Sequence, residues 1–429
     1  MRLYKMELYK ICSRKLFLFS VTAALMILLL FMYTLAVDNY AMVNGVEYEG
    51  LRAVQINRTI TEEFKGTLTD EKVTAIAEKY GFPSGVKEDY GRFLDRNYLN
   101  EFIMEAFSDG YFRAYDDYKV ATHTNPIAET DLGKASAATG KPLLLEYTYG
   151  WEVFHAVLGI GLTLGMVFIL LTLSPIYSEE TYNNTQQILF TTKEGQQKDI
   201  AAKIAAGMTI AVCVFGVIVL LDFLFVWSVF GLDGLDCFSS QVLEDVYIRD
   251  WNGYHNTSTW SVQKYLSFYL LQGFFGMIEA AALSLYFSAH CNSPFQSIVA
   301  SVMGLVLPVF LNVIGRDNFR GIIFQVSQLI ILLLPGIALM CLVPDTLNKI
   351  VVRIGKILCC VLPVLIGRFF RHVFPFYYTI PVTLIMNGAS ELDFMQVHFP
   401  WIWWGIFLFV TVVTILYIVC SWRKYKELS

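Results

Sequence analysis

The stretch LFLFSVTAALMILLLFMYTLAV, residues 16–37, decides the fold class of this chain. It contains no charged side chain, and at about 1.5 Å of rise per residue a helix of this length crosses a hydrocarbon core of about 30 Å. The apolar run is longer than the roughly 7–15 residues of a signal peptide, so we expect an uncleaved anchor. Only 16% of the 429 residues are charged, against about 25% in soluble domains.

Similar apolar runs recur along the chain and predict an all-α polytopic membrane protein. Further spans are expected at residues 151–174, 204–230, 264–289, 295–315 and 401–420. Together the third to fifth spans occupy 204–315, and the last span leads into a tail that ends at residue 429. Each run is about as long as a bilayer crossing requires.

The region 316–400 leaves the number of spans open between six and eight. Residues 322–343 are long enough to cross, whereas the apolar run 351–388 is interrupted by basic residues such as Arg353 and Arg368. Several prolines in this region favour broken, re-entrant helices, which are tolerated only where protein covers them or where they line a cavity. Two termini on one side require an even number of crossings.

Both termini carry basic residues, which mark the cytoplasmic side of a membrane protein. Residues 1–15 hold five Lys or Arg, and the last nine residues hold three. The alternation of apolar and basic side chains in 1–15 predicts an amphipathic helix in the cytoplasmic membrane interface. We therefore expect an integral protein of the plasma membrane, most simply the bacterial cytoplasmic membrane, that contacts its lipids and has both ends in the cytoplasm.

Residues 38–150 form the one long polar insertion and predict an external domain. They carry 19 Asp and Glu against 12 Lys and Arg, and none of the eight cysteines. The domain therefore has to be held together by packing rather than by disulfides. Residues 69–80 read as a helix with an acidic first turn. Residues 95–115 read as a second helix with Leu99, Phe102, Ile103 and Phe107 at helical spacing and Gly110 as a possible stop, so a small, mainly helical domain is expected.

The polar segment between the second and third spans, 175–203, is the most informative part of the sequence. Ser178 is a candidate N-cap for a short helix with Glu179 and Glu180 in its first turn, where the helix dipole favours anions. That helix ends in an apolar contact tip, Ile188-Leu189-Phe190. A turn at 191–195 then leads into a second helix, from residue 196, that enters the third span. The tip could bind a cleft on a cytoplasmic partner, or it could simply touch the bilayer interface.

This layout resembles a known family over residues 1–315. The resemblance is most specific in 1–36, with the sequence ELYKICSRK, and in 175–210, with an acidic pair followed by TQQILFTT. The chain looks like the permease subunit of an ATP-binding-cassette (ABC) transporter of the type-two exporter class. In that family the segment after the second span carries a coupling helix that sits on a separate ATPase subunit.

The resemblance implies a set of coupling residues. It places Glu179 or Glu180 at the acidic position of the family, Thr185 at its threonine, and Leu189 with the following threonines at its helix end. The sequence departs from the pattern at Asn184, where glycine is usual, and at 193–195, where the turn often contains proline. The residues expected to couple to the ATPase are Glu179, Glu180, Thr185, Ile188, Leu189, Phe190 and Thr191.

The resemblance also implies the partners. A cytoplasmic ATP-binding subunit would bind ATP and Mg²⁺, and a second copy or a related permease would complete the path. The chain itself has no phosphate-binding G-x-x-x-x-G-K-[ST] motif, no H-E-x-x-H and no G-x-S-x-G. We therefore expect a transport subunit that is not an enzyme, with no cofactor or metal of its own and no nucleic-acid partner.

Two carboxylates lie inside predicted spans and are candidates for the translocation path. Asp222 is in the third span and Glu279 near the middle of the fourth. A charge at this depth is costly, so such groups usually face the interior of a bundle or a wet cavity. They could line a path, bind a proton or cation, or be structural carboxyls between helices. Their depths differ by about 10 Å at the rise of an α-helix, which argues against one shared site.

Two other classes of function fit the sequence. The chain could be a membrane-anchored sensor or assembly factor with 38–150 as its receptor domain. It could also be an ion-coupled carrier that uses Asp222 and Glu279, although no internal repeat supports this. The resemblance favours the exporter subunit, and the sequence leaves its substrate open.

Overall fold

The computed structural model describes the chain except residues 1, 84–94, 115–116, 120, 122, 192–196, 242–259, 319–331, 344–347, 371–378, 387–401 and 428–429. In the described part, five helices are long and apolar enough to cross a membrane. They are α2 (Lys15–Val37), α7 (Tyr149–Leu173, which α8 extends), α10 (Lys198–Val229), α12 (Val262–His290) and α18 (Ile402–Glu427). The chain is thus mostly helical with the apolar helices of an integral membrane protein, as the sequence predicts.

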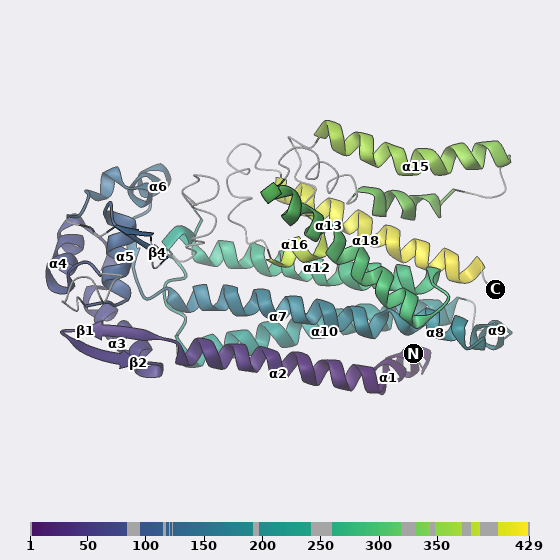
Figure 1. Cartoon of the computed structure of the whole chain (residues 1–429), viewed down its shortest axis with the longest axis horizontal. Helices are drawn as coiled ribbons and strands as arrows, with labels where there is room; N and C mark the ends of the chain where they lie inside the picture. Colours follow the sequence, from purple (N-terminus) through teal and green to yellow (C-terminus); the bar gives the residue numbers. More distant parts are fainter. Residues whose placement is uncertain are drawn as a thin grey trace.

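The spanning helices lie side by side in one bundle (Figure 1), with the N- and C-termini at the same end and α3 to α6 at the opposite end. A further helix, α13 (Pro294–Asn318), covers the predicted fifth span, and its stretch Pro294–Leu307 is apolar. Both termini lie at the same end of the bundle, which is consistent with an even number of crossings. The choice between six and eight stays a prediction, because parts of 316–400 lie outside the described residues.

The centre of the bundle is formed by α7 and α12. In each, 61% of the apolar window is buried, against 17% for α2, which lies at the edge. Close approach of α7 to α10 depends on Gly161 and Gly165, because a Cβ on either would lie 2.7 or 2.6 Å from a side-chain carbon of Ile218. Small residues at helix interfaces permit such contact, so this G-x-x-x-G is explained by packing.

The domain opposite the termini has its own apolar core, separate from that of the bundle. Its helices are α3 (Leu51–Phe64), α4 (Asp70–Tyr80), α5 (Tyr98–Phe107) and α6 (Asp131–Thr139), with a short 3₁₀ turn η1 (Ile127–Glu129). Among its described residues, three two-stranded antiparallel sheets accompany them: β1 (Tyr40–Val43) with β2 (Val46–Glu49), β3 (Gly66–Thr67) with β6 (Leu144–Leu145), and β4 (Tyr111–Ala114) with β5 (Asp117–Lys119). The domain is mainly helical, with small sheets that the sequence did not predict.

The helices predicted for this domain are found, one of them shortened. The Thr69 hydroxyl caps α4 by accepting a hydrogen bond from the Lys72 amide. The second helix, predicted within 95–115 with Gly110 as a possible stop, is α5, which begins at Tyr98 and ends at Phe107, three residues before that glycine. Gly110 lies beside Ala121, where a Cβ would have only 2.7 Å of space, and the chain turns there into β4. The predicted apolar face is otherwise correct, with Phe107 fully buried and Phe102 at its edge.

The region 316–400 includes α15 (Lys349–Phe370) and α16 (Pro381–Met386), together with helical residues 332–340. Proline does not break α15, which continues through Pro363, so the expectation of a broken helix is wrong there. A short helix is found at α16, where Pro381 occupies the first helical position that proline favours. In Figure 1, α15 lies along the outside of the bundle.

Candidate functional site

The segment after the second span folds as two short helices instead of the single helix that we predicted. The first, α8 (Pro175–Tyr182), directly continues α7, and the second, α9 (Thr185–Phe190), follows a turn in which Asn184 has φ of 55°. Asparagine adopts this left-handed conformation more readily than most residues. Ser178 is not the N-cap, because it lies inside α8 with its hydroxyl 3.0 Å from the carbonyl oxygen of Ser174.

The helix α9 lies at the same end of the molecule as both termini, beyond the ends of the neighbouring spans (Figure 1). The side chain of Ile188 is 69% exposed, whereas Leu189 is partly buried. Thr185 joins the two helices, because its hydroxyl donates to the carbonyl oxygen of Glu180 at 3.3 Å. Thr191, which is exposed, donates to the carbonyl oxygen of Ile188 at 2.7 Å and ends the helix.

The remaining parts of the predicted contact lie mostly outside the residues that the structure describes. Phe190 belongs to α9, but its side chain is not described, and the predicted turn 191–195 falls, apart from Thr191, within the undescribed residues 192–196. The second predicted helix begins at Lys198 and runs without interruption into the third span as α10. Of the predicted tip, Ile188 is therefore the member that the structure places at the surface.

The two predicted acidic residues are occupied in holding α8 to its neighbours. Glu180 is 4% exposed and accepts hydrogen bonds from Lys10 on α1 (Arg2–Cys12) and from the Tyr425 hydroxyl on α18. Glu179 pairs with Arg14, which follows α1. Both residues therefore fix the base of α8 and α9 rather than offering a free acidic surface.

A buried lysine that sequence reasoning missed completes this network. Lys203 on α10 is 0% exposed and pairs with Asp199 one turn earlier, while its Nζ lies 3.3 Å from carboxylate oxygens of both Glu7 and Glu180. A buried ion pair is worth little net energy when intact, but loss of one partner typically costs about 3–5 kcal/mol. The i, i+4 spacing of Asp199 and Lys203 at the start of an apolar helix was the signal available in the sequence.

We call Glu7, Lys10, Glu180, Asp199 and Lys203 the ionic cluster. It joins four segments that are far apart in the sequence: α1, α8, α10 and, through Tyr425, α18. The cluster has three carboxylates for two ammonium groups. Burial raises the pKa of the Glu7 carboxyl above its usual range, although the nearby charges of Lys203 and Lys10 act in the opposite direction.

Helix α1 is more than an interfacial helix. Ile11 is buried in the bundle core, and the Tyr4 hydroxyl donates to Thr209 on α10 at 3.0 Å. Its other face carries Met6 and Tyr9, which are 64% and 76% exposed. The exposed outer face and the packed inner face together give α1 the amphipathic character that the sequence predicts. The inner side of α1 also contributes to the ionic cluster.

The two intramembrane carboxylates are buried in separate places. Asp222 on α10 is fully buried, and neither of its oxygens has a hydrogen-bond partner among the described residues. It lies near enough to Tyr269 on α12 for an electrostatic interaction. Glu279 is on the same helix ten residues beyond Tyr269, or about 15 Å along its axis. The structure therefore does not bring Asp222 and Glu279 into one site.

Glu279 faces a small cavity between α12, α13, α16 and α18. The cavity has a volume of about 20 Å³ and is also lined by Thr379 and Tyr417. Glu279 is 5% exposed, and its Oε2 has no hydrogen-bond partner among the described residues. A space of this size holds about one water molecule, so the site can accommodate a protonated or hydrated carboxyl but no transported molecule of ordinary size.

Within the described ranges, no group of three or more His, Cys, Asp or Glu side chains is placed to hold a metal ion. No protein-family model matches the chain, and no curated protein or solved structure is significantly similar to it.

Proposed function

We propose that this chain is the permease subunit of an ABC transporter, most simply an exporter, in the plasma membrane with both termini in the cytoplasm. It would supply one half of a translocation path and pair with a second copy or a related permease. A separate cytoplasmic subunit would bind ATP and Mg²⁺ and carry out hydrolysis. The segment 175–203 would transmit the motion of that subunit to the membrane helices.

The observation that carries this proposal is the position of α9 in the structure. It extends from the terminus-bearing end of the bundle on α7 and α8, and it presents Ile188 at its surface. An aliphatic side chain exposed at the tip of this helix offers a partner apolar area that would be buried on binding. Tyr182, which is 65% exposed, lies at the end of α8 and widens the apolar area available to a partner.

The ionic cluster gives such a contact a mechanical consequence. A force on α9 acts on α8 through the Thr185 bond and the short turn, and Glu180 connects α8 to Lys10, Lys203 and Tyr425. Those three residues belong to α1, α10 and α18. Closure of an ATPase dimer would then tilt several helices together, which is a rigid-body transition of the kind that switches access in transporters.

An ion-coupled carrier is the second candidate, favoured by the Asp222 oxygens and the Glu279 Oε2, which have no hydrogen-bond partner among the described residues. Buried ionisable groups inside spans often mark ion or proton pathways. Their separation along the bundle gives this alternative two sites rather than one. A carrier would transport without ATP and would not depend on α9, so the two candidates make opposite predictions.

The decisive experiment compares Ile188→Asp with Gln187→Asp, which adds the same charge to the neighbouring, already exposed position of α9. Each variant is purified from its native membrane and tested for a retained nucleotide-binding subunit and for ATPase activity in vesicles. We expect Ile188→Asp to lower partner retention by more than about 10-fold, since it replaces an apolar side chain of the proposed contact with a charge. Gln187→Asp should change it little.

Retention of the subunit and of full ATPase activity by Ile188→Asp would refute the coupling role of α9. Transport by the wild-type chain in vesicles without nucleotide would instead favour the carrier. A co-purified protein without ATPase activity would point to a sensor or assembly factor with 38–150 as its receptor domain.

A further inference from the structure

A thiol and an imidazole lie together where α12 ends. Cys341, directly after the helical residues 332–340, has its sulfur 3.4 Å from Nε2 of His290, the last residue of α12. Both side chains are partly exposed, and neither belongs to the ionic cluster or to α9. A thiol within reach of a neighbouring base is the arrangement that activates a cysteine as a nucleophile.

The hydrogen bonds of His290 determine which ring nitrogen acts as the base. Its Nδ1 lies 2.7 Å from the carbonyl oxygen of Tyr286, one turn earlier in α12. A carbonyl oxygen only accepts, so Nδ1 carries the proton, and Nε2 of the neutral ring is the acceptor. The Tyr286 ring packs against the imidazole with 4.3 Å between the ring centroids. The Cys341 thiol therefore donates to Nε2 and can pass its proton to the imidazole.

A second thiol lies beside this pair. Cys420 on α18 is fully buried, and its thiol donates to the carbonyl oxygen of Ala338 at 3.0 Å. The same carbonyl accepts a hydrogen bond from the backbone amide of Cys341, also at 3.0 Å. The two sulfur atoms are within hydrogen-bonding reach of each other. An accessible thiol with a base, next to a buried thiol, has the arrangement of an attacking and a resolving cysteine.

The site lies at the membrane surface on the side of the chain termini. The last turn of α12 packs on α8, since the Tyr177 amide donates to Ser288 at 2.9 Å, and α18 ends at the C-terminus (Figure 1). Arg423 donates to the carbonyl oxygen of Leu342 at 3.0 Å, and an arginine near the end of a spanning helix keeps its charge at the polar interface. A small water-soluble oxidant can therefore reach Cys341.

We propose that Cys341 and Cys420 are a redox-modification site, at which hydrogen peroxide or an organic hydroperoxide converts the two thiols into a reversible disulfide. Cys341 passes its proton to His290, and its sulfur attacks one peroxide oxygen. The O–O bond breaks, Cys341 becomes a sulfenic acid, and the leaving oxygen takes the proton from His290 and departs as water or an alcohol. The Cys420 sulfur then attacks the Cys341 sulfur, the S–O bond breaks, and the hydroxyl leaves with the Cys420 proton as water.

The two electrons that the thiols give to the peroxide are returned by a thiol such as glutathione, through thiol–disulfide exchange. Disulfides in a reducing compartment are transient and redox-sensing, which fits the cytoplasmic side proposed above. The bond would join residues 332–341 covalently to the last span. Tyr425, farther along α18, donates to Glu180, so a fastened α18 would also limit movement at the ionic cluster.

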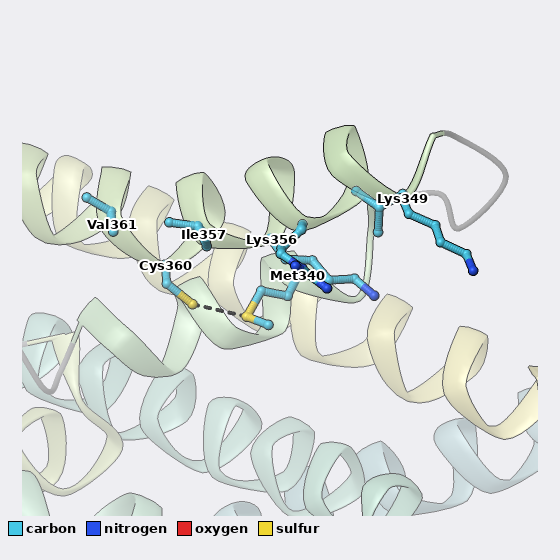
Figure 2. Close-up of a pocket in the computed structure, with 8 residues that line it drawn as sticks. Met340, Lys349, Lys356, Ile357, Cys360 and Val361 are labelled. Atoms are coloured by element: carbon cyan, nitrogen blue, oxygen red, sulfur yellow. Dashed lines mark hydrogen bonds between the residues drawn. The ribbon is translucent and has the colours of Figure 1, made fainter.

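Packing alone explains Cys420 but not Cys341. A buried thiol with a carbonyl partner behaves as a small apolar side chain. Cys360 on α15 offers the comparison for Cys341, because it is partly exposed as well. Figure 2 shows its thiol donating to the sulfur of Met340 at 3.0 Å. A thioether is a weak acceptor and not a base, so Cys360 should keep the reactivity of an ordinary thiol.

The test counts and locates oxidised thiols in the full-length protein, purified in detergent under reducing conditions. After removal of the reductant, the protein is exposed to hydrogen peroxide for timed intervals, and the remaining thiols are alkylated with iodoacetamide. Intact mass gives the number of free thiols among the eight cysteines, and peptide mass spectrometry identifies the linked pair. The variants are Cys341→Ser, Cys420→Ser, His290→Gln and, as the matched control, Cys360→Ser. Circular dichroism and size-exclusion elution verify that each is folded.

We expect the wild type and Cys360→Ser to lose two free thiols first and to yield the Cys341–Cys420 link, which dithiothreitol reverses. Cys341→Ser should not form this link. An ordinary thiol is only a few per cent ionised at neutral pH, so pairing with a base should make Cys341 react about 10-fold faster than Cys360. His290→Gln should remove most of this difference. Cys420→Ser should instead accumulate the Cys341 sulfenic acid, which dimedone traps.

Equal oxidation rates of Cys341 and Cys360 in the wild type would overturn the proposal, and this comparison needs no variant to fold. A folded His290→Gln protein that reacts as fast as the wild type would overturn it too. A link from Cys341 to Cys291 or to another copy of the chain, in place of Cys420, would refute the assigned pair. None of these readouts depends on transport or on the ATPase partner, so the proposed function can fail while this site stands.

Discussion

Replacement of Lys203 by methionine is the sharpest perturbation of the ionic cluster. Lys203 is fully buried, and its removal leaves the carboxylates of Glu7, Glu180 and Asp199 with Lys10 as the one ammonium group within the cluster. Removing one partner of a buried ion pair costs about 3–5 kcal/mol. We expect a loss of stability of this size, with methionine filling most of the lysine stem's volume.

A compensated variant separates charge from packing. Adding Glu7→Gln and Asp199→Asn to Lys203→Met leaves Glu180 paired with Lys10, so the cluster is again balanced. Since neutral replacement of a whole buried ion network is often close to neutral in stability, we expect the triple variant to recover most of the loss. The assay is the free energy of unfolding in mixed micelles, followed by tryptophan fluorescence.

The pH dependence gives an independent check. The pKa of Glu7 is raised by burial, and removal of Lys203 takes away the cation that lowers it most, so the pKa rises further. A folded-state pKa above the unfolded value means that the folded state binds the proton more tightly. This stabilisation is fully present below the unfolded pKa and is lost as pH rises through the folded value. Lys203→Met should therefore be less destabilised at pH 5 than at pH 8.

Equal destabilisation of Lys203→Met and of the compensated triple variant would refute this reasoning. It would mean that the shape of Lys203, rather than its charge, holds α10 against its neighbours. A destabilisation of Lys203→Met that grows as the pH falls would contradict the assignment of Glu7 to the excess negative charge.

The remaining predictions concern helix packing, the buried carboxylates and the end domain. Gly165→Leu should destabilise the bundle by about 1–3 kcal/mol through overpacking, measured by thermal unfolding. Gly216→Leu should be tolerated, because no neighbouring element among the described residues comes within 4 Å of its Cβ position. Asp222→Asn and Glu279→Gln should each lower transport in vesicles without loss of the ATPase partner, and unchanged transport would make them structural. Phe107→Ala should destabilise the end domain by about 3–5 kcal/mol, seen as faster cleavage within 38–150 by limited proteolysis while the bundle stays resistant.

Much of the architecture could be read from the order of residues. The apolar runs predicted the spanning helices, because a helix that is apolar all round over about 20 residues has few alternatives to a membrane. Thr69 predicted the start of α4, and the spacing of Leu99 and Phe107 predicted the buried face of α5. These are local properties, so neighbouring residues contain the information.

The predicted coupling segment shows where local reasoning failed. Ser178, followed by two acids, has the composition of a helix start, yet the helix begins at Pro175 as a continuation of α7. The preference for an N-cap is worth about 1 kcal/mol, whereas burial of a side chain such as Ile176 in α8 is worth about 1.5–3 kcal/mol. Helix α5 ends at Phe107, three residues before Gly110, which the sequence offers as a possible stop; the close fit of Gly110 against Ala121 is visible only in the fold.

The sequence by itself determined that this protein spans a membrane, where its polar domain is inserted, and which segment joins the second and third spans. Only the tertiary structure decided that Lys203 is buried, that Glu180 connects α8 to helices from both ends of the chain, and that Asp222 and Glu279 occupy separate places. The physical reason is that hydrophobicity is a sum over neighbouring residues, whereas the energy of a buried charge depends on partners that are up to 245 positions apart. Ile188 was predicted as part of a contact, but only the fold showed that Glu179 and Glu180 hold its base instead of sharing its surface.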